Sequence, residues 1–344
     1  MIQLLLPSFF LSLIGIFNIF GIRQSLATKQ VLYTVIGFMT FLILKKIGRN
    51  FFAANYKFFY WLLIIFLIVT FLIGLEVKGS RRWIDFYFFN FQASEIFKGF
   101  FILFISGFLV RDYREVNPIR IFLQSLIYFL LPAFIIFKQP DLGNAAVYFF
   151  IYLMIILFSD LPKKYIFYFC LFLVLILPLG WQFMKGYQKD RIASFLNPQI
   201  DQQGTAYNMT QAIITVGSGK FIGRGLGLGT QSRLFFLPEN HTDFAFSSLV
   251  EQFGFLGGFA VIILYIIVTY LIVKKIFVLY FLRDFTDKKN FLYAVGFLSY
   301  FVFQILINIA MNLGLFPITG IALPFISFGG SSFVALMIGM ALLP

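Results

Sequence analysis

Acidic, cysteine and histidine side chains are all scarce in this chain of 344 residues, which has 14 Asp plus Glu, one cysteine and one histidine. Cys170 alone cannot form an intrachain disulfide or a cysteine-based metal site. His241 alone cannot form a multi-histidine metal centre such as H-E-x-x-H. Charged residues make up 12% of the chain and apolar residues 60%, whereas an ordinary soluble domain is about 25% charged. The composition therefore excludes a soluble protein and indicates a chain that lies mostly in lipid.

The net charge of +13 does not indicate a nucleic-acid partner. Such a partner requires a soluble basic face, and this chain has too few polar residues to build one. We therefore expect no nucleic acid among the partners, and we expect the charge to reflect membrane topology.

Long apolar runs account for most of the chain. A bilayer core of about 30 Å needs roughly 20 apolar residues per helix. Runs of this kind predict an all-α polytopic membrane protein with about ten transmembrane helices. The expected spans are Ile2–Ile22, Val31–Leu44, Phe58–Leu75, Ile96–Val110, Ile121–Phe137, Asn144–Phe158, Tyr165–Met184, Phe244–Val273, Phe291–Met311 and Thr319–Leu343.

The distribution of Lys and Arg between the loops predicts the orientation. The even-numbered loops carry 14 cations, and the short odd-numbered loops carry 6. By the positive-inside rule, both termini then lie in the cytoplasm and the chain is a multi-pass protein of the cytoplasmic (inner) membrane. The 14 cations are Lys45, Lys46, Arg49, Lys57, Arg111, Arg114, Arg120, Lys163, Lys164, Lys274, Lys275, Arg283, Lys288 and Lys289, and the 6 are Arg23, Lys29, Lys78, Arg81, Arg82 and Lys138.

One long loop, residues 185–242, separates the seventh and eighth expected spans and should lie on the outer face. Loops of this length are usually functional or disordered. This loop contains a helix-compatible stretch, Ala206–Thr215, and a turn at Asn197-Pro198. We expect a single integral membrane domain over residues 1–344, with this loop as the first place to look for a site.

Asp243 is the most informative acid in the chain. It follows Thr242 at the start of the eighth span, where a helix N-terminus favours a carboxylate, so simple helix capping is one interpretation. Asp243, Ser247 and Glu251 are spaced i, i+4, i+8 and form a polar stripe that we expect to face a cavity. Glu251 could instead hold a helix contact. A hydrolase triad with His241 is disfavoured, because no nucleophile elbow is present.

Glu95 and Lys98 stand at i, i+3 near the start of the fourth span and should be neighbours on one helix face. They form either a functional pair or a self-neutralising pair at a helix end. Near the eighth span, Glu239 and His241 add titratable groups that fit a general acid or base site.

Glycines recur from Gly217 to Gly229, but this stretch is not a phosphate-binding P-loop. Ile214 and Phe221 stand where a P-loop needs Gly and Ser or Thr. A flexible surface loop remains one interpretation, and an anion-binding loop with Lys220, Arg224 and Arg233 is the other. Arg82 and Trp83, with Arg81, form a similar cluster of basic and aromatic residues, where Trp is often only an interfacial anchor.

Six segments, in order, resemble the SEDS family of shape, elongation, division and sporulation proteins, the RodA and FtsW membrane glycosyltransferases. The likeness spans most of the chain, and Asn308–Met311 makes it more similar to RodA. The segments are Arg81–Asp85 with Gln92–Lys98, Gln139–Gly143, Asp190–Pro198, Gly217–Gly219, Leu237–Phe244 with Glu251–Gly257, and Pro317–Ser332.

The resemblance implies polymerisation of lipid II into peptidoglycan strands in cell elongation and shape maintenance. Asp243, which matches the family's essential aspartate, would take the proton from the acceptor hydroxyl. Lys98, Arg191 or a divalent cation such as Mg²⁺ or Mn²⁺ would stabilise the leaving pyrophosphate. The other residues expected to bind substrate are Glu95, Arg82, Trp83, Lys220, Arg224, Glu239, His241, Ser247 and Glu251.

The resemblance also implies partners, which are a class B penicillin-binding protein for cross-linking and the surrounding membrane lipids. Two other functions stay open from the sequence. A flippase for the lipid-linked precursor would also need polar residues in its bundle, although we detect no inverted repeat. A non-catalytic scaffold for a cell-wall synthase is the third.

Overall fold

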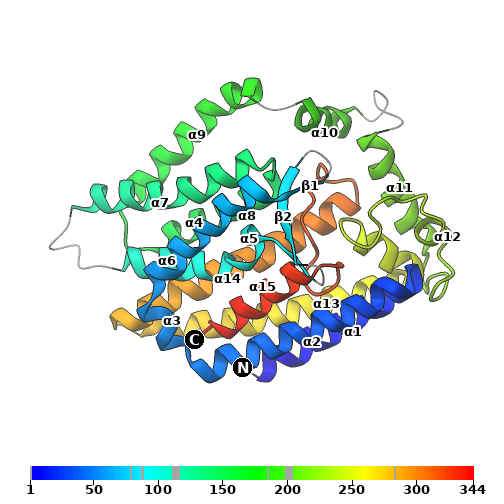
Figure 1. Cartoon of the computed structure of the whole chain (residues 1–344), viewed down its shortest axis with the longest axis horizontal. Helices are drawn as coiled ribbons and strands as arrows, with labels where there is room; N and C mark the ends of the chain where they lie inside the picture. The colour runs from blue at the N-terminus through cyan, green and yellow to red at the C-terminus, as the bar shows by residue number, and fades with distance from the viewer. Residues whose placement is uncertain are drawn as a thin grey trace. The chain divides into compact units, whose positions relative to one another are not determined.

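The computed structural model describes residues 2–77, 80–86, 89–110, 117–183, 186–197, 204–282 and 284–344, most of them in helices (Figure 1). Four cations that contributed to the predicted orientation, Lys78, Arg111, Arg114 and Arg283, lie outside these residues. So do Pro198 of the expected turn, Met184 at the end of the seventh expected span and Lys185 at the start of the long loop. The helices are α1 (Ile2–Ile22), α2 (Gln24–Ile47), α3 (Arg49–Ala54), α4 (Tyr56–Ile73), α5 (Ala93–Ile96), α6 (Lys98–Leu109), α7 (Pro118–Lys138), α8 (Leu142–Phe158), α9 (Lys163–Phe183), α10 (Gly186–Leu196), α11 (Thr205–Ser218), α12 (Thr230–Arg233), α13 (Ala245–Phe281), α14 (Phe285–Asn312) and α15 (Gly330–Ala341).

The multi-pass helical architecture predicted from the apolar runs is confirmed. Six helices in the described part of the chain are long and apolar enough to cross a membrane, namely α1, α2, α4, α7, α13 and α14. Three further apolar helices, α6, α8 and α15, are shorter. The total of about ten spans stays a prediction.

Local sequence explains several helix ends. The Asn117 side chain accepts a hydrogen bond from the Ile119 N–H at 3.1 Å, and Pro118 occupies the first helical position, so α7 begins there. Asp141 caps α8 in the same way by accepting from the Asn144 N–H. The expected helix from Ala206 to Thr215 is confirmed as part of α11.

A small antiparallel sheet, which the sequence did not predict, precedes α5. It has the strand order β1 (Leu75–Val77), β2 (Ser80–Asp85), β3 (Asn90–Phe91). Such short strands carry too few residues for a readable alternation of polar and apolar side chains. The sheet places Arg82 and Trp83 on a strand.

The chain divides into two compact units, each with most of its contacts inside itself, and we describe them one at a time. Unit 1 comprises Met1–Val31, Phe167–Val268 and Gln304–Phe328, and unit 2 comprises Leu32–Ile166, Thr269–Phe303 and Gly329–Pro344. A single domain over residues 1–344 therefore stays a prediction. Within unit 2, α4 packs against α6 and α7, α7 packs against α8, and α15 packs against α5 and α6.

The helix α13 is broken at Gly254, inside unit 1. The φ and ψ angles of this glycine are 70° and −169°, a combination that is essentially restricted to glycine. A Cβ atom built on Gly254 would lie 2.3 Å from the Gly223 nitrogen. Glycine is therefore required both for the backbone conformation and for the close approach of the loop.

The tenth expected span, Thr319–Leu343, is wrong in its first half. Only Gly330–Ala341 is helical, and residues 317–328 are irregular. Side chains from other elements of unit 1 donate to three carbonyls of this segment: Arg191 to Ile318 at 3.2 Å, Asn308 to Ile321 at 2.7 Å, and Tyr265 to Pro324 at 2.6 Å. Irregular backbone survives at membrane depth only when protein groups provide such partners.

Candidate active site

In unit 1, the backbone around Asp243 is held at three consecutive residues. The His241 carbonyl accepts from the Phe328 N–H at 2.8 Å, and the Thr242 carbonyl accepts from the Ser327 hydroxyl at 2.6 Å. The Asp243 carbonyl accepts from the side-chain amides of Asn308 and Asn312, both at 3.1 Å. The Asp243 side chain itself is half-buried. Its carboxylate is thus presented from a fixed backbone, which favours a preorganised reactive group.

Asn312 connects Asp243 to Ser247. Its Oδ1 accepts from both the Ser247 N–H at 2.9 Å and the Ser247 hydroxyl at 2.7 Å, and Ser247 is fully buried. Asn308 entered the sequence interpretation only through the family likeness, and Asn312 did not enter it. The sequence did contain a signal for these contacts, namely two asparagines at i, i+4 spacing on the apolar helix α14. Buried amides need hydrogen-bond partners, so such a pair indicates polar contacts with another element.

Glu239 and His241 lie beside Asp243 in sequence and bond within the same turn. The Thr242 hydroxyl donates to Glu239 Oε2 at 2.7 Å, and His241 Nδ1 lies 3.1 Å from Asn240 Oδ1. The His241 ring also packs against Phe328, with 5.7 Å between the centroids. Both side chains are half-buried, and their substrate-binding roles stay predictions.

Glu251 does not face a cavity, contrary to the expectation for the polar stripe. Its side chain is 0% exposed, and its carboxylate accepts from Gln231 N–H at 2.8 Å, Ser232 N–H at 3.0 Å and the Ser232 hydroxyl at 2.6 Å. The Ser218 hydroxyl adds a longer contact of 3.5 Å. Ser247 is also fully buried. Of the three residues in the predicted polar stripe, only Asp243 is therefore partly exposed, and Ser247 and Glu251 face the protein interior. Glu251 and Ser247 hold neighbouring parts of unit 1 together, and their substrate-binding roles stay predictions.

The backbone of the glycine-rich stretch is hydrogen-bonded to α13 around its break at Gly254. Arg224 N–H donates to the Glu251 carbonyl at 2.9 Å, and Phe255 N–H donates to the Lys220 carbonyl at 2.9 Å. Lys220 and Arg224 project exposed side chains. Arg191 lies on α10 and donates to Ile318. The substrate-binding roles of these three cations stay predictions.

In unit 2, Glu95 and Lys98 form the close pair that their spacing predicted. Lys98 Nζ lies 2.7 Å from Glu95 Oε1, and Lys98 is 0% exposed. The helix between them is interrupted, because Phe97 has φ −88° and ψ 2° and separates α5 from α6. A fully buried ammonium requires a nearby carboxylate, so the two charges depend on each other.

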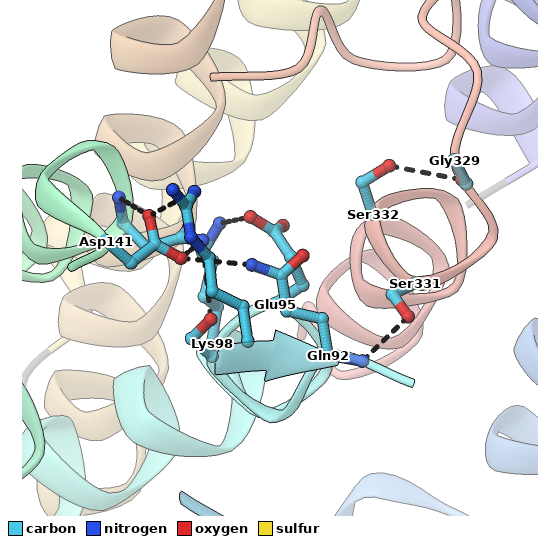
Figure 2. Close-up of polar contacts among 10 residues, drawn as sticks. Gln92, Glu95, Lys98, Asp141, Gly329, Ser331 and Ser332 are labelled. Atoms are coloured by element: carbon cyan, nitrogen blue, oxygen red, sulfur yellow. Dashed lines mark hydrogen bonds and ion pairs between the residues drawn. The ribbon is translucent and has the colours of Figure 1, made fainter. Parts of the chain in front are cut away.

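Asp141 organises the rest of this cluster and was missed as a site residue in the sequence, although it lies in a family segment. Its carboxylate accepts from Gln92 Nε2 at 3.1 Å and Asn144 Nδ2 at 2.9 Å, and lies 3.5 Å from Arg82 Nη1. Figure 2 shows Gln92, Glu95, Lys98 and Asp141 with their side chains gathered together. The cap on α8 explains Asp141 locally, and the fold also brings it to Arg82.

Ser331, at the start of α15, ties this cluster to the C-terminal helix of unit 2. Its hydroxyl accepts from the Gln92 N–H at 3.0 Å (Figure 2). The same hydroxyl donates to the Asn90 carbonyl at 2.5 Å. On the other side, the Arg82 guanidinium lies 5.5 Å from the centroid of the Trp83 ring, within the range of a cation–π contact. Three strand residues, Arg82, Trp83 and Asn90, and four helices, α5, α6, α8 and α15, therefore meet at one polar cluster.

Comparison with known proteins now assigns the family. The model of the FtsW/RodA/SpoVE family of cell cycle proteins matches residues 4–344. The chain belongs to this family.

Relatives in the family are named as peptidoglycan glycosyltransferases. The chain is 32% identical to the probable peptidoglycan glycosyltransferase FtsW of Wigglesworthia glossinidia brevipalpis, over 96% of this chain and 89% of the relative. It is 34% identical to the peptidoglycan glycosyltransferase MrdB of Helicobacter pylori, over 98% of this chain and 85% of the relative. Since these two identities are close, the more specific likeness to RodA stays a prediction.

Solved structures share the fold of this FtsW/RodA/SpoVE family member. A chain of a peptidoglycan synthase complex, reported for its coordination of polymerization and crosslinking, aligns with a TM-score of 0.80, 24% identity, and coverage of 99% of this chain and 95% of that chain. The rod shape determining protein RodA of Thermus thermophilus aligns with a TM-score of 0.72, 21% identity, and coverage of 99% and 94%.

A dedicated metal site does not emerge among the described residues of this family member, where no group of three or more His, Cys, Asp or Glu side chains comes together. In the cluster of unit 2, Lys98 pairs with Glu95 and Arg82 with Asp141, so both acids already have a cation beside them. A divalent cation would have to rely on substrate phosphates for most of its ligands, as Mg²⁺ often does. The need for Mg²⁺ or Mn²⁺ stays a prediction.

Proposed function

We propose that this protein is a peptidoglycan glycosyltransferase that polymerises lipid II, with Asp243 as the general base. The observation that carries the proposal is the clamp on residues 241–243, in which Phe328, Ser327, Asn308 and Asn312 fix three consecutive carbonyls. A base must hold one position relative to the hydroxyl it deprotonates. The names of the family relatives supply the reaction class.

In the proposed reaction, the Asp243 carboxylate takes the proton of the acceptor GlcNAc 4-hydroxyl. The hydroxyl oxygen bonds to the anomeric carbon of the donor as the bond from that carbon to the pyrophosphate oxygen breaks. The α-linkage becomes β, and undecaprenyl pyrophosphate leaves with the bonding electrons. A positioned base typically contributes about 10²- to 10⁴-fold to such a step.

The cluster of Arg82, Glu95, Lys98 and Asp141 in unit 2 is proposed as an anion-binding site. Its four charges sum to zero, so a pyrophosphate would compete with Glu95 for Lys98 and with Asp141 for Arg82. Arg82 is the more accessible cation, since its side chain is 19% exposed whereas that of Lys98 is 0% exposed. We therefore assign the first contact with the pyrophosphate to Arg82.

The proposed location is the cytoplasmic membrane with both termini inside, as the 14 cytoplasmic-side cations against 6 support. Residues 185–242 then lie on the outer face, where lipid II presents its sugars. A class B penicillin-binding protein is the proposed partner for cross-linking, and a solved peptidoglycan synthase complex contains a chain of this fold.

Purified protein incubated with labelled lipid II tests the proposal. Asp243→Asn should insert and fold but make no glycan strands, because asparagine cannot accept the proton. The matched control is Asp284→Asn, an exposed acid at the other end of α13 and α14, which should polymerise normally. Reconstitution with lipid II in one leaflet, with and without the partner, separates polymerisation from a flippase and from a scaffold. Normal strand synthesis by Asp243→Asn would overturn the assignment.

A further inference from the structure

The segment from Lys220 to Phe236 carries apolar side chains that the proposed reaction does not use. Its exposed members are Phe221, Ile222, Leu226, Leu228, Leu234, Phe235 and Phe236, and Ile222 is 74% exposed. Lys220, Arg224 and Arg233 are exposed between them and form no ion pair with any carboxylate in the described part of the chain. A water-facing loop would not expose so many large apolar side chains in one place.

The apolar side chains continue a lipid-facing row of α13. Phe221 stacks on Phe255 with 6.0 Å between ring centroids, and Phe255 stacks on Phe259 at 5.8 Å. Phe255 and Phe259 are both at least half exposed on α13. The loop therefore extends a surface that already belongs to a membrane-crossing helix.

The backbone of the loop is satisfied in a way that suits a site without water. Arg224 N–H donates to the Glu251 carbonyl and Gly225 N–H to the Gln252 carbonyl, while Phe255 N–H donates to Lys220 and Leu256 N–H to Phe221. These four bonds, of 2.9 to 3.1 Å, use the groups that the break at Gly254 frees in α13. Irregular backbone in the apolar part of a bilayer requires such internal pairing.

The length of the uncharged part of α13 indicates how deep these four hydrogen bonds lie in the bilayer. From Phe255 to Val273, α13 is free of charge for 19 residues, and Lys274 follows. At 1.5 Å per residue this run is about 28 Å long, close to the bilayer core of about 30 Å. If Lys274 marks the cytoplasmic boundary, Gly254 lies at the outer boundary, and any tilt moves it into the apolar core.

We propose that residues 220–236 form an anchor in the outer leaflet, in which Phe221 and Ile222 enter the acyl region and Lys220, Arg224 and Arg233 meet phospholipid phosphates. Basic and aromatic side chains alternate in this way in segments that lie in the membrane interface. The proposal relies on the orientation given above but not on catalysis. Two of the cations expected to bind substrate, Lys220 and Arg224, then bind the bilayer.

Spin labels in nanodiscs test the depth directly, since Cys170 is the only native cysteine. In a Cys170→Ser background, Ile222→Cys is the test position and Phe259→Cys is the lipid-facing reference. Asp284→Cys, an exposed position between α13 and α14 and outside the proposed anchor, is the aqueous reference. The label at Ile222 should collide with oxygen as at Phe259 and be protected from a water-soluble nickel relaxant. Accessibility to nickel like that at position 284 would overturn the anchor and leave the patch as a protein-binding surface.

The phosphate contacts have their own test. In nanodiscs of equimolar phosphatidylcholine and phosphatidylglycerol, Lys220→Glu with Arg224→Glu should move the Ile222 label towards water, and the change should be smaller in phosphatidylcholine alone. An unchanged depth in both lipid mixtures would refute the role of the cations. Neither readout depends on glycan synthesis, so failure here is distinguishable from failure of the proposed activity.

Discussion

Replacing Glu251 by glutamine is expected to release α12 and the glycine-rich loop from α13. The native carboxylate has two oxygens and accepts from Gln231 N–H, from Ser232 N–H and from the Ser232 hydroxyl. An amide has only one acceptor oxygen. Its best orientation keeps both Ser232 bonds and turns an NH₂ group towards the Gln231 N–H, which then has no acceptor.

The size of the effect follows from these contacts. One buried N–H without a partner costs about 1–3 kcal/mol, and the two remaining bonds weaken because a charged acceptor makes bonds roughly twice as strong as a neutral one. The sum is about 2–4 kcal/mol in the free energy that keeps the loop closed. Since every 1.4 kcal/mol is tenfold, the population of the open loop should rise about 30- to 700-fold.

Trypsin cleavage after Arg233 measures this population when opening is fast relative to cleavage. The Glu251→Gln variant should be cut faster by the factor above. The control is Glu76→Gln, which breaks an exposed pair with Arg81 at 3.1 Å in unit 2 and should leave cleavage at Arg233 unchanged. If Glu251→Gln is cleaved at the wild-type rate, the structural role of Glu251 is refuted. If this variant also has a raised KM for lipid II, the substrate-binding role expected from the sequence is supported instead.

Two further predictions concern the buried pair and the broken helix. Glu95→Gln and Lys98→Met should each lower stability by about 3–5 kcal/mol, because each leaves one uncompensated buried charge, and the double variant should recover part of that loss in thermal unfolding. If the double variant regains stability but not polymerisation, the pair is functional; recovery of both would make it a self-neutralising pair. Gly254→Ala should reduce the yield of folded protein sharply, whereas Gly48→Ala, also at positive φ but with no atom within 4 Å of the added Cβ, should cost only about 1–3 kcal/mol.

The apolar runs predicted most helices because burial in lipid depends on local composition. The span Ile2–Ile22 coincides with α1, and Ile121–Phe137 lies within α7. The prediction was wrong at residues 319–328, where the sequence is apolar but Gly320 and Pro324, with Pro317 just before them, oppose a helix. The mean hydropathy of a segment does not reflect the effect of proline and glycine on helix formation.

The candidate site was predictable only in part, because its partners are distant in sequence. Asp243 stood out as a rare acid at a helix start, yet Asn308 and Asn312, which hold it, are 65 and 69 residues away. Asp141 reaches Gln92 across 49 residues. A spacing rule detects neighbours on one helix, as it did for Glu95 and Lys98, but contains no information on contacts between elements.

The irregular segment 317–328 has a consequence for biogenesis. Three of its carbonyl groups accept from Arg191, Tyr265 and Asn308, and all three donors precede the segment in the chain. During synthesis these donors have therefore left the ribosome before the segment that needs them. The segment cannot enter the apolar phase alone, since its carbonyls would be unsatisfied there. The C-terminal region should consequently insert only after the earlier helices have assembled, so this segment should be among the last to reach its native structure in the membrane.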